Sequence, residues 1–141
     1  MTPGAATASR GIVSFMDESS VGALIGMVMS VVVLGILFMV TRLGASGDMG
    51  RNGAVGIRTK ATQRSDAAWR TGHAAALPVA RTACLLVLVV DLICLVLIFA
   101  GPEALTPWFG IVPAVGLLIA VVPIVLAAKK GADAAPPAPG P

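Results

Sequence analysis

The chain has 141 residues, of which 57% are hydrophobic and 12% are charged, and its formal net charge is +3. Soluble domains usually carry about 25% charged residues, so this composition excludes an ordinary water-soluble globule. One domain of this length, with its apolar residues in long blocks, is typical of a small integral membrane protein. A large soluble enzyme, a disulfide-rich secreted scaffold and a disordered tail protein are excluded as well.

The first part of the chain predicts a tail followed by a membrane span. Residues 1–20 are mostly small and polar, which is typical of a disordered tail. An uncharged apolar run follows, and because about 20 such residues cross a bilayer, we expect a transmembrane helix over 21–43. A cleavable signal peptide is the alternative, since the small residues at 45–47 resemble a cleavage site. The acidic residues Asp17 and Glu18 and the length of the run favour a membrane span.

Small residues recur every four positions in this first span. Gly22, Gly26 and Ser30 lie on one face of the predicted helix, and such a face lets another helix approach closely within a membrane. The partner is another helix of this chain, a second copy in a homo-oligomer, or a subunit of a larger complex. We therefore expect Gly22 and Gly26 to take part in helix packing.

Residues 44–81 form a loop that is rich in glycine at its start and basic throughout. Ser65 is a predicted N-cap, with Asp66 in the first turn of the helix that it begins. Trp69 and His73 then lie one turn apart on one face, which predicts a short interfacial helix with Trp69 at the headgroup level. The structural interpretation is a collar with an interfacial tryptophan, a solvated histidine and snorkelling arginines.

Two further spans form a predicted hairpin. We expect transmembrane helices over 82–100 and 108–128, joined by a turn at 101–107 that contains glycine and proline. The tail at 129–141 is rich in alanine and proline, which is typical of disorder. The sequence thus predicts an all-α membrane protein with three transmembrane helices and a basic cytoplasmic loop that contains a short interfacial helix.

Asp91 stands near the middle of the second predicted span. A central aspartate costs about 2.5–3.5 kcal/mol on a membrane-insertion scale. The thirteen Leu, Ile, Val and Phe residues of that span return roughly 4–8 kcal/mol, so the helix still inserts. We expect Asp91 to point into the bundle, towards Ser30. A proton or ion relay is one interpretation, but a contact that fixes helix packing or a partner helix is favoured because no second ionisable group accompanies it.

Basic residues predict the orientation of the chain. If the helices alternate, nine of the ten Lys and Arg residues fall on one side of the membrane. The positive-inside rule then places the loop and the C-terminus in the cytoplasm and the N-terminus outside. The positive charge is explained by anionic lipid of the inner leaflet and requires no nucleic acid.

Catalytic, cofactor and metal sites are not expected. The chain has one histidine, and no pattern of metal ligands or of catalytic side chains is present. Cys84 and Cys94 lie about 15 Å apart along one predicted helix, beyond the reach of a disulfide, and are interpreted as small core residues. We therefore expect a protein that is not an enzyme.

The loop resembles the signature of the SdpI-like family of bacterial membrane proteins. The resemblance covers residues 52–73, together with one membrane helix before them and two after. The chain departs from it at Lys60, where many members have proline, and in having fewer membrane helices than the namesake. The matching residues are Asn52, Gly56, Ile57, Arg58, Thr59, Thr62, Ser65, Trp69 and His73.

This resemblance implies a multi-pass plasma-membrane protein without known catalysis. The family is named for a protein that protects a cell from its own secreted toxin and recruits a repressor to the membrane. It implies toxin immunity or membrane sensing, with Arg58, Arg64, Arg70 and His73 available to a soluble cytoplasmic regulator. The alternative is an accessory subunit that stabilises a larger inner-membrane complex, for which the small size, Asp91 and the small-residue face are equally suited.

Overall fold

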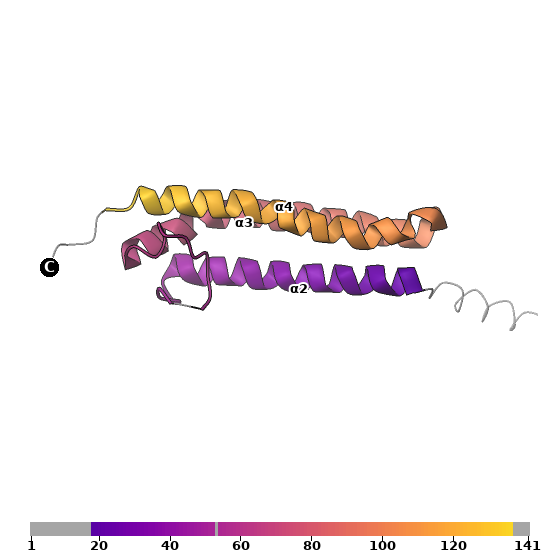
Figure 1. The fold of residues 1–141 in the computed structure, drawn as a ribbon, viewed down its shortest axis with the longest axis horizontal. Helices are drawn as coiled ribbons and strands as arrows, with labels where there is room; N and C mark the ends of the chain where they lie inside the picture. Colours follow the sequence, from indigo (N-terminus) through magenta and orange to yellow (C-terminus); the bar gives the residue numbers. More distant parts are fainter. Residues whose placement is uncertain (1–17, 53, 137–141) are drawn as a thin grey trace, which may run out of the picture.

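The computed structural model describes residues 18–52 and 54–136, and it shows three long helices that lie side by side (Figure 1). These are α2 (Glu18–Ser46), α3 (Asp66–Ala100) and α4 (Thr106–Asp133), with the short 3-10 helix η1 (Glu103–Leu105) before α4. Among the described residues, each of the three helices is long and apolar enough to cross a membrane. The chain is therefore an all-α membrane protein.

The three predicted spans lie inside the three observed helices, and the helices extend beyond them. The predicted short interfacial helix is not a separate element, because the residues after Ser65 form the start of α3, which continues into the second span. The first residues of the predicted C-terminal tail are helical, since α4 continues to Asp133. Residues 1–17 of the predicted N-terminal tail and residues 137–141 of the C-terminal tail lie outside the described residues.

The length of α3 shows which part of it leaves the membrane. Its 35 residues span about 52 Å at about 1.5 Å per residue, whereas the hydrocarbon core is about 30 Å thick. The apolar run from Thr82 to Ala100 fills the core, so Asp66–Arg81 projects beyond it. Trp69 and His73 therefore lie outside the hydrocarbon.

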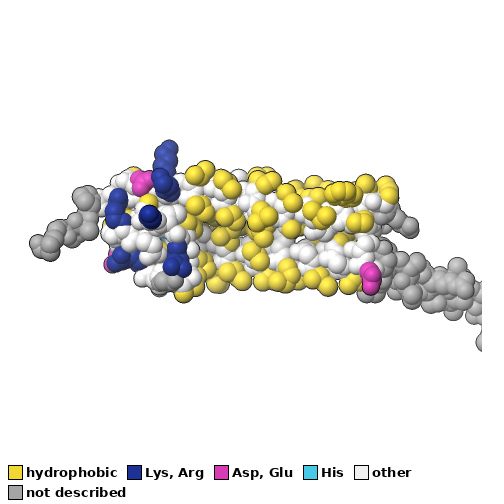
Figure 2. Space-filling view, in the orientation of Figure 1, with side chains coloured by type: hydrophobic (Ala, Val, Ile, Leu, Met, Phe, Trp, Pro, Cys, Tyr) yellow, Lys and Arg dark blue, Asp and Glu magenta, His cyan; other side chains and the backbone are white. Residues whose placement is uncertain are grey.

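Charged and apolar side chains occupy different parts of the bundle surface, as expected for a protein that crosses a membrane. In Figure 2, Lys and Arg side chains gather at one end, and hydrophobic side chains cover the surface along the rest of the bundle. Large apolar side chains such as Leu118 and Ile119 are exposed there, as expected where lipid replaces water around the helices. We call the end that carries Arg42, Arg70, Arg81 and Lys130 the basic end.

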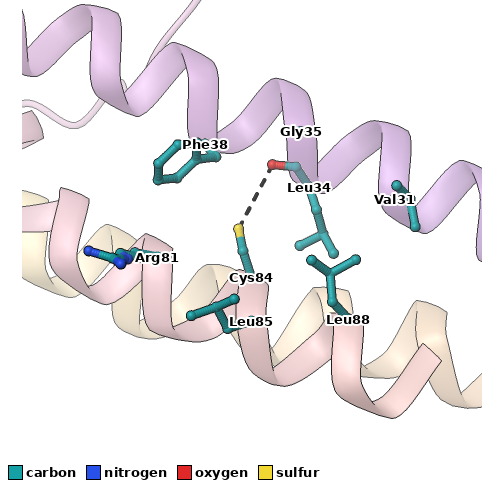
Figure 3. Close-up of a pocket in the computed structure, with 8 residues that line it drawn as sticks. All are labelled: Val31, Leu34, Gly35, Phe38, Arg81, Cys84, Leu85 and Leu88. Atoms are coloured by element: carbon teal, nitrogen blue, oxygen red, sulfur yellow. Dashed lines mark hydrogen bonds between the residues drawn. The ribbon is translucent and has the colours of Figure 1, made fainter. Parts of the chain in front are cut away.

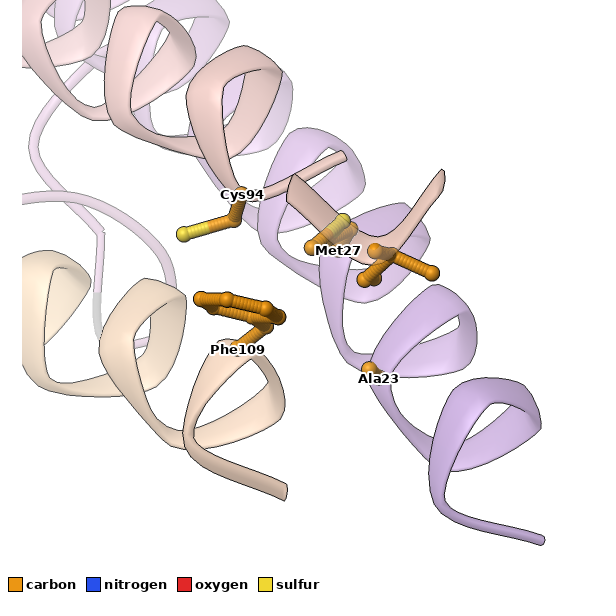
Figure 4. Close-up of a cluster of buried hydrophobic side chains, with 5 residues drawn as sticks. Ala23, Met27, Cys94 and Phe109 are labelled. Atoms are coloured by element: carbon orange, nitrogen blue, oxygen red, sulfur yellow. The ribbon is translucent and has the colours of Figure 1, made fainter. Parts of the chain in front are cut away.

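Apolar clusters connect the helices from one end of the bundle to the other. Figure 4 shows the cluster at the end opposite the basic end, where Met27 of α2, Cys94 of α3 and Phe109 of α4 converge. Towards the basic end the packing becomes closer, because a Cβ on Gly131 of α4 would overlap Ala75 of α3. Small residues thus let α3 and α4 approach within backbone contact at the basic end.

Candidate functional site

Residues 47–52 and 54–65 fold back over the basic end of the bundle (Figure 1). We call these residues the cap segment. Asn52 shapes its first half, because the Oδ1 atom of Asn52 accepts hydrogen bonds from the backbone N–H groups of Ala54 (3.0 Å) and Val55 (2.8 Å). The Asn52 side-chain amide also donates to the carbonyl oxygen of Gly50 at 3.0 Å. An asparagine that bonds to the backbone two or three residues further on is typical of a tight turn.

Gly56 brings the cap segment onto α3. Its φ of 115° lies in the region that residues with a Cβ rarely adopt. A Cβ at this position would also overlap the ring of Trp69 and lie 3.2 Å from the Nε2 atom of His73. Glycine is therefore required at residue 56 by its backbone conformation and by the close approach of two aromatic rings.

His73 is fully buried and has both ring nitrogens engaged. Nε2 accepts a hydrogen bond from the backbone N–H of Ile57 at 3.1 Å, and Nδ1 lies 2.8 Å from the carbonyl oxygen of Trp69. This pairing assigns the proton of the neutral ring to Nδ1. Burial lowers the pKa of His73 below its usual value of 6.5, and the hydrogen bond to Trp69 opposes this shift without cancelling it. The imidazole is thus held uncharged at neutral pH.

Trp69 packs against His73, with 4.3 Å between the ring centroids. The expectation of an interfacial tryptophan and a solvated histidine is corrected here, because Trp69 is 1% exposed and His73 is 0% exposed. The indole N–H of Trp69 donates to the carbonyl oxygen of Met49 at 3.0 Å. Trp69 therefore joins α3 to the start of the cap segment and does not face a headgroup layer.

Two threonines hold the second half of the cap segment. The Thr62 hydroxyl, which is fully buried, donates to the carbonyl oxygen of Ile57 at 2.6 Å and accepts from the Thr59 backbone N–H at 2.9 Å. The Thr59 hydroxyl accepts in turn from the Thr62 backbone N–H at 3.1 Å. A Cβ on Gly72 of α3 would lie 2.9 Å from the Thr62 methyl group. This pair thus closes a turn that rests directly on α3.

The cap segment ends by capping two helices. Ser65 is the N-cap of α3, where its hydroxyl accepts a hydrogen bond from the Ala68 N–H at 3.1 Å. Arg64 donates to the carbonyl oxygens of Ala132 (2.8 Å) and Ala135 (3.3 Å) at the end of α4. The Ala132 carbonyl oxygen also accepts from the backbone N–H of Ala135 at 3.2 Å, and Ala135 follows the last residue of α4. Arg64 thus adds a charged donor at the C-terminal end of α4.

Sequence reasoning missed some of these contacts. Arg64 was expected on a partner surface, yet its guanidinium is used to join the cap segment to α4. Arg51 was counted only as a basic residue, but it pairs with Asp66 (3.1 Å) and donates to the carbonyl oxygen of Gln63 (2.8 Å). Gly44 of α2 was also missed, and a Cβ there would lie 2.5 Å from the His73 ring. No local pattern signals these contacts, because each partner belongs to a different element or to the opposite end of the cap segment.

The basic side chains that remain free lie on the outside of this end. Arg58 and Lys60 in the cap segment and Arg70 on α3 are exposed. Within the described residues none of the three forms an ion pair, whereas Arg51 and Lys129 do. The motif therefore divides into residues that build the cap and residues that the cap displays. The motif residues that build it are Asn52, Gly56, Ile57, Thr59, Thr62, Ser65, Trp69 and His73. Arg58 is displayed, together with Lys60 and Arg70, which lie outside the motif.

The polar residues predicted within the membrane lie well away from the cap. Asp91 of α3 and Ser30 of α2 face each other and are 5% and 4% exposed. Among the described residues, neither the Ser30 hydroxyl nor either Asp91 carboxylate oxygen makes a hydrogen bond. Asp91 also borders a groove of about 410 Å³ between α2 and α3. The two side chains are brought together as expected and lie close enough to interact, but their atoms do not meet the geometry of a hydrogen bond among the described residues.

The two glycines of the first helix differ in their surroundings. A Cβ on Gly26 would lie 3.5 Å from the carbonyl oxygen of Gly110 on α4, whereas a Cβ on Gly22 would meet nothing within 4 Å. Gly26 therefore lies at the α2–α4 contact, and Gly22 faces outwards. Within the described part of the chain, no group of three or more His, Cys, Asp or Glu residues is placed to hold a metal ion.

A known protein family matches the part of the chain that makes these contacts. The family model described as the SdpI/YfhL protein family matches residues 48–127, which is more than half of the chain. The match begins in the cap segment and ends in α4, so it includes all the motif residues described above. Neither the curated proteins nor the solved structures contain a match to the chain.

Proposed function

The chain belongs to the SdpI/YfhL family, and from this membership we propose that it acts in toxin immunity or membrane signalling by docking a soluble cytoplasmic partner on its cap segment. The protein is multi-pass, with three apolar helices. We place it in a bacterial plasma membrane with the basic end in the cytoplasm and the N-terminus outside. The gathering of Lys and Arg at one end (Figure 2) supports this orientation.

The observation that carries the proposal is that some residues of this region are buried and hydrogen-bonded, whereas others are exposed and basic. Trp69 and His73 of α3 are buried against the cap segment and bond to its backbone, and Thr62 bonds within the cap segment. Arg58 and Lys60 project from the resulting frame into solvent with no described ion-pair partner. A rigid frame that holds unpaired cations is suited to an acidic partner surface, because little side-chain and loop entropy remains to be lost on binding.

The proposed role is not catalytic. His73 is the one histidine of the chain, and both of its nitrogens are engaged with the backbone of Ile57 and Trp69. A general base needs a free nitrogen within hydrogen-bond reach of a substrate, and His73 is buried away from any such contact. Its role is to hold the cap segment on α3.

The test is a deletion strain grown in conditioned medium from its parent culture. The immunity proposal predicts slower growth of the deletion strain and recovery when the wild-type gene is returned. The double variant Arg58→Gln/Lys60→Gln should fail to restore growth, because it removes the displayed charges. The control Lys129→Gln/Lys130→Gln removes the same charge from the same end and should restore it.

Two results would contradict separate parts of the proposal, the immunity role and the docking surface. Unchanged growth of the deletion strain removes the immunity role. Full recovery with Arg58→Gln/Lys60→Gln removes the cap segment as the docking surface, even if the deletion is harmful. Membrane fractions probed with a C-terminal tag show in each case whether the variant has accumulated to the wild-type level.

An accessory subunit of a larger membrane complex is the second candidate function. The observation that favours it is Asp91, whose buried carboxylate finds no hydrogen bond among the described residues, because such a group in a membrane is expected to pair with another helix. Purification from native membranes in a mild detergent, followed by mass spectrometry, tests this function. Other integral subunits in fixed stoichiometry support it, and recovery of the chain without them contradicts it.

A further inference from the structure

A groove runs along the contact between α2 and α3 from the basic end towards the middle of the membrane. It consists of three adjoining cavities of about 380, 360 and 410 Å³. Phe38 and Arg81 line both the first and the second cavity, and Val31 and Leu88 line both the second and the third. Because neighbouring cavities share lining residues, the three cavities form one continuous groove on the surface of the bundle.

The mouth of this groove is basic. Arg42 of α2 and Arg81 of α3 line the first cavity together with Phe38, Leu77 and Pro78. Both arginines are exposed. Within residues 18–52 and 54–136, the ion pairs are Arg51–Asp66 and Lys129–Asp133, so neither Arg42 nor Arg81 has a carboxylate partner. Two guanidinium groups thus flank the mouth without a counter-charge from the part of the chain that the structure describes.

The middle of the groove is apolar. Figure 3 shows Arg81 and Phe38 at one end of this cavity and Val31 and Leu88 towards the other. Gly35 leaves space on the α2 side, because a Cβ there would meet nothing within 4 Å. Among the described residues that line the second and third cavities, the charged ones are Arg81 at the mouth and Asp91 in the third cavity.

The dimensions of the groove match one leaflet. Ten residues separate Arg81 from Asp91 on α3, which is about 15 Å at about 1.5 Å per residue. One leaflet supplies half of a hydrocarbon core of about 30 Å. An acyl chain that hangs from a headgroup at Arg81 therefore ends near the level of Asp91, after passing the apolar walls.

We propose that this groove binds one anionic phospholipid from the leaflet at the basic end. The phosphate lies between the guanidinium groups of Arg42 and Arg81, and one acyl chain follows Phe38, Gly35 and Leu88. Guanidinium groups bind phosphate through paired, charge-assisted hydrogen bonds. An anionic phospholipid is favoured over a zwitterionic one because it brings no ammonium group next to the two arginines.

Charge argues against a second copy of the chain as the occupant. A two-fold contact through the same groove would bring Arg42 and Arg81 of both copies together. Four arginines with no described carboxylate among them repel one another, whereas one anionic headgroup lowers the positive charge of the two arginines at the mouth.

The experiment is native mass spectrometry of the full chain, purified in detergent and mixed with equal amounts of dioleoyl phosphatidylglycerol and dioleoyl phosphatidylcholine. The wild-type protein is expected to retain one phosphatidylglycerol molecule in preference to phosphatidylcholine. The double variant Arg42→Gln/Arg81→Gln should lower this preference by about 30-fold, from the usual contribution of a basic residue to binding an anionic lipid. Lys129→Gln/Lys130→Gln loses the same charge at the same end and should keep the preference.

A second pair of variants tests the acyl part of the groove. Gly35→Leu places a side chain in the open space of the groove, and its expected result is loss of the retained lipid. Gly22→Leu is the matched control, because Gly22 lies on the same helix and its Cβ would also meet nothing within 4 Å. That variant should retain the lipid as the wild type does.

Four results overturn the proposal. The first is equal retention of the two lipids by the wild type, and the second is an equal loss of preference in the two charge variants. The third is an equal loss of lipid in the two leucine variants. The fourth is a dimer of the wild type that Gly35→Leu separates and Arg42→Gln/Arg81→Gln preserves, which assigns the groove to a second copy.

Discussion

Buried polar groups differ between the cap at the basic end and the middle of the membrane-spanning bundle. In the cap at the basic end, His73 and Thr62 are fully buried and hydrogen-bonded. In the membrane, Asp91 and Ser30 are almost as buried, and their side-chain oxygens make no hydrogen bond within the described residues. Burying an unpaired polar group costs free energy. The hydrogen-bonded groups of the cap avoid this cost, whereas Asp91 and Ser30 do not. This difference teaches that the motif explains the fold of the cap, and that binding should be sought in exposed or unpaired groups.

The largest expected effect comes from opening the cap at Gly56. Gly56→Ala adds a Cβ at a φ of 115° and against the Trp69 ring, so we expect the free energy of unfolding to fall by about 3–5 kcal/mol. Thermal unfolding in detergent, followed by tryptophan fluorescence, measures this change. Gly50→Ala is the control, because its Cβ would meet nothing within 4 Å. Equal melting temperatures for the two variants would show that the cap does not limit stability.

Lowering the pH should also destabilise the cap, by a smaller amount than Gly56→Ala. The pKa of His73 is lowered by burial, so the folded state binds its proton less readily than the unfolded state does. The stability contribution is therefore complete above the usual pKa of 6.5 and is lost as the pH falls below it, by at most about 1.4 kcal/mol per pH unit. Protonation places a hydrogen on Nε2, where the Ile57 N–H now donates. Melting curves between pH 7.5 and 5 test this slope.

His73→Gln is the control for the pH experiment, because glutamine does not titrate. Its stability should be lower than that of the wild type at pH 7.5, and its slope between pH 7.5 and 5 should be flatter. If the two slopes are the same, groups other than His73 cause the pH dependence.

The membrane half is expected to respond in the opposite direction. Asp91→Leu replaces a buried carboxylate that lacks a described hydrogen bond, so the isolated protein should gain about 1–2 kcal/mol of stability. Unfolding in detergent measures this gain, with Asp91→Asn as the variant that keeps the size and polarity of the side chain. A loss of stability in Asp91→Leu would mean that the carboxylate is satisfied within the bundle and that the two regions do not differ.

The smallest effect concerns the link between the cap segment and α4. Arg64→Ala removes the donor to the Ala132 and Ala135 carbonyl oxygens, and we expect a loss of about 1 kcal/mol. Arg58→Ala removes an exposed arginine of the same segment and should change stability by less than about 0.5 kcal/mol. Equal losses would place Arg58 within the frame instead of on its surface.

Local signals in the sequence were sufficient for the spans and for the start of α3. Long uncharged runs predict transmembrane helices because the bilayer penalises any other arrangement of the backbone. Ser65 was recognisable as an N-cap because its partner, the Ala68 N–H, lies three residues away. The proximity of Trp69 to His73 also followed from helical spacing.

The environment of those two aromatic residues could not be predicted in the same way. Trp69 was expected at the headgroups and His73 in solvent, but both are buried, since the cap segment returns over them. That return depends on contacts of Gly56, Ile57 and Met49 with residues 13 to 20 positions further along the chain. Such contacts leave no periodic signal, and the same residues read locally are compatible with an exposed loop.

The sequence by itself determined that the chain is an all-α membrane protein with three spans, because hydropathy and helix length act over consecutive residues. It also located the motif and the basic end. Only the tertiary structure decided which motif residues build the cap and which are displayed. It alone left Asp91 without a hydrogen bond among the described residues and placed Arg42 beside Arg81 at the mouth of a groove. These outcomes depend on how separate helices pack, and packing is a property of side chains that meet across the bundle and are distant along the chain.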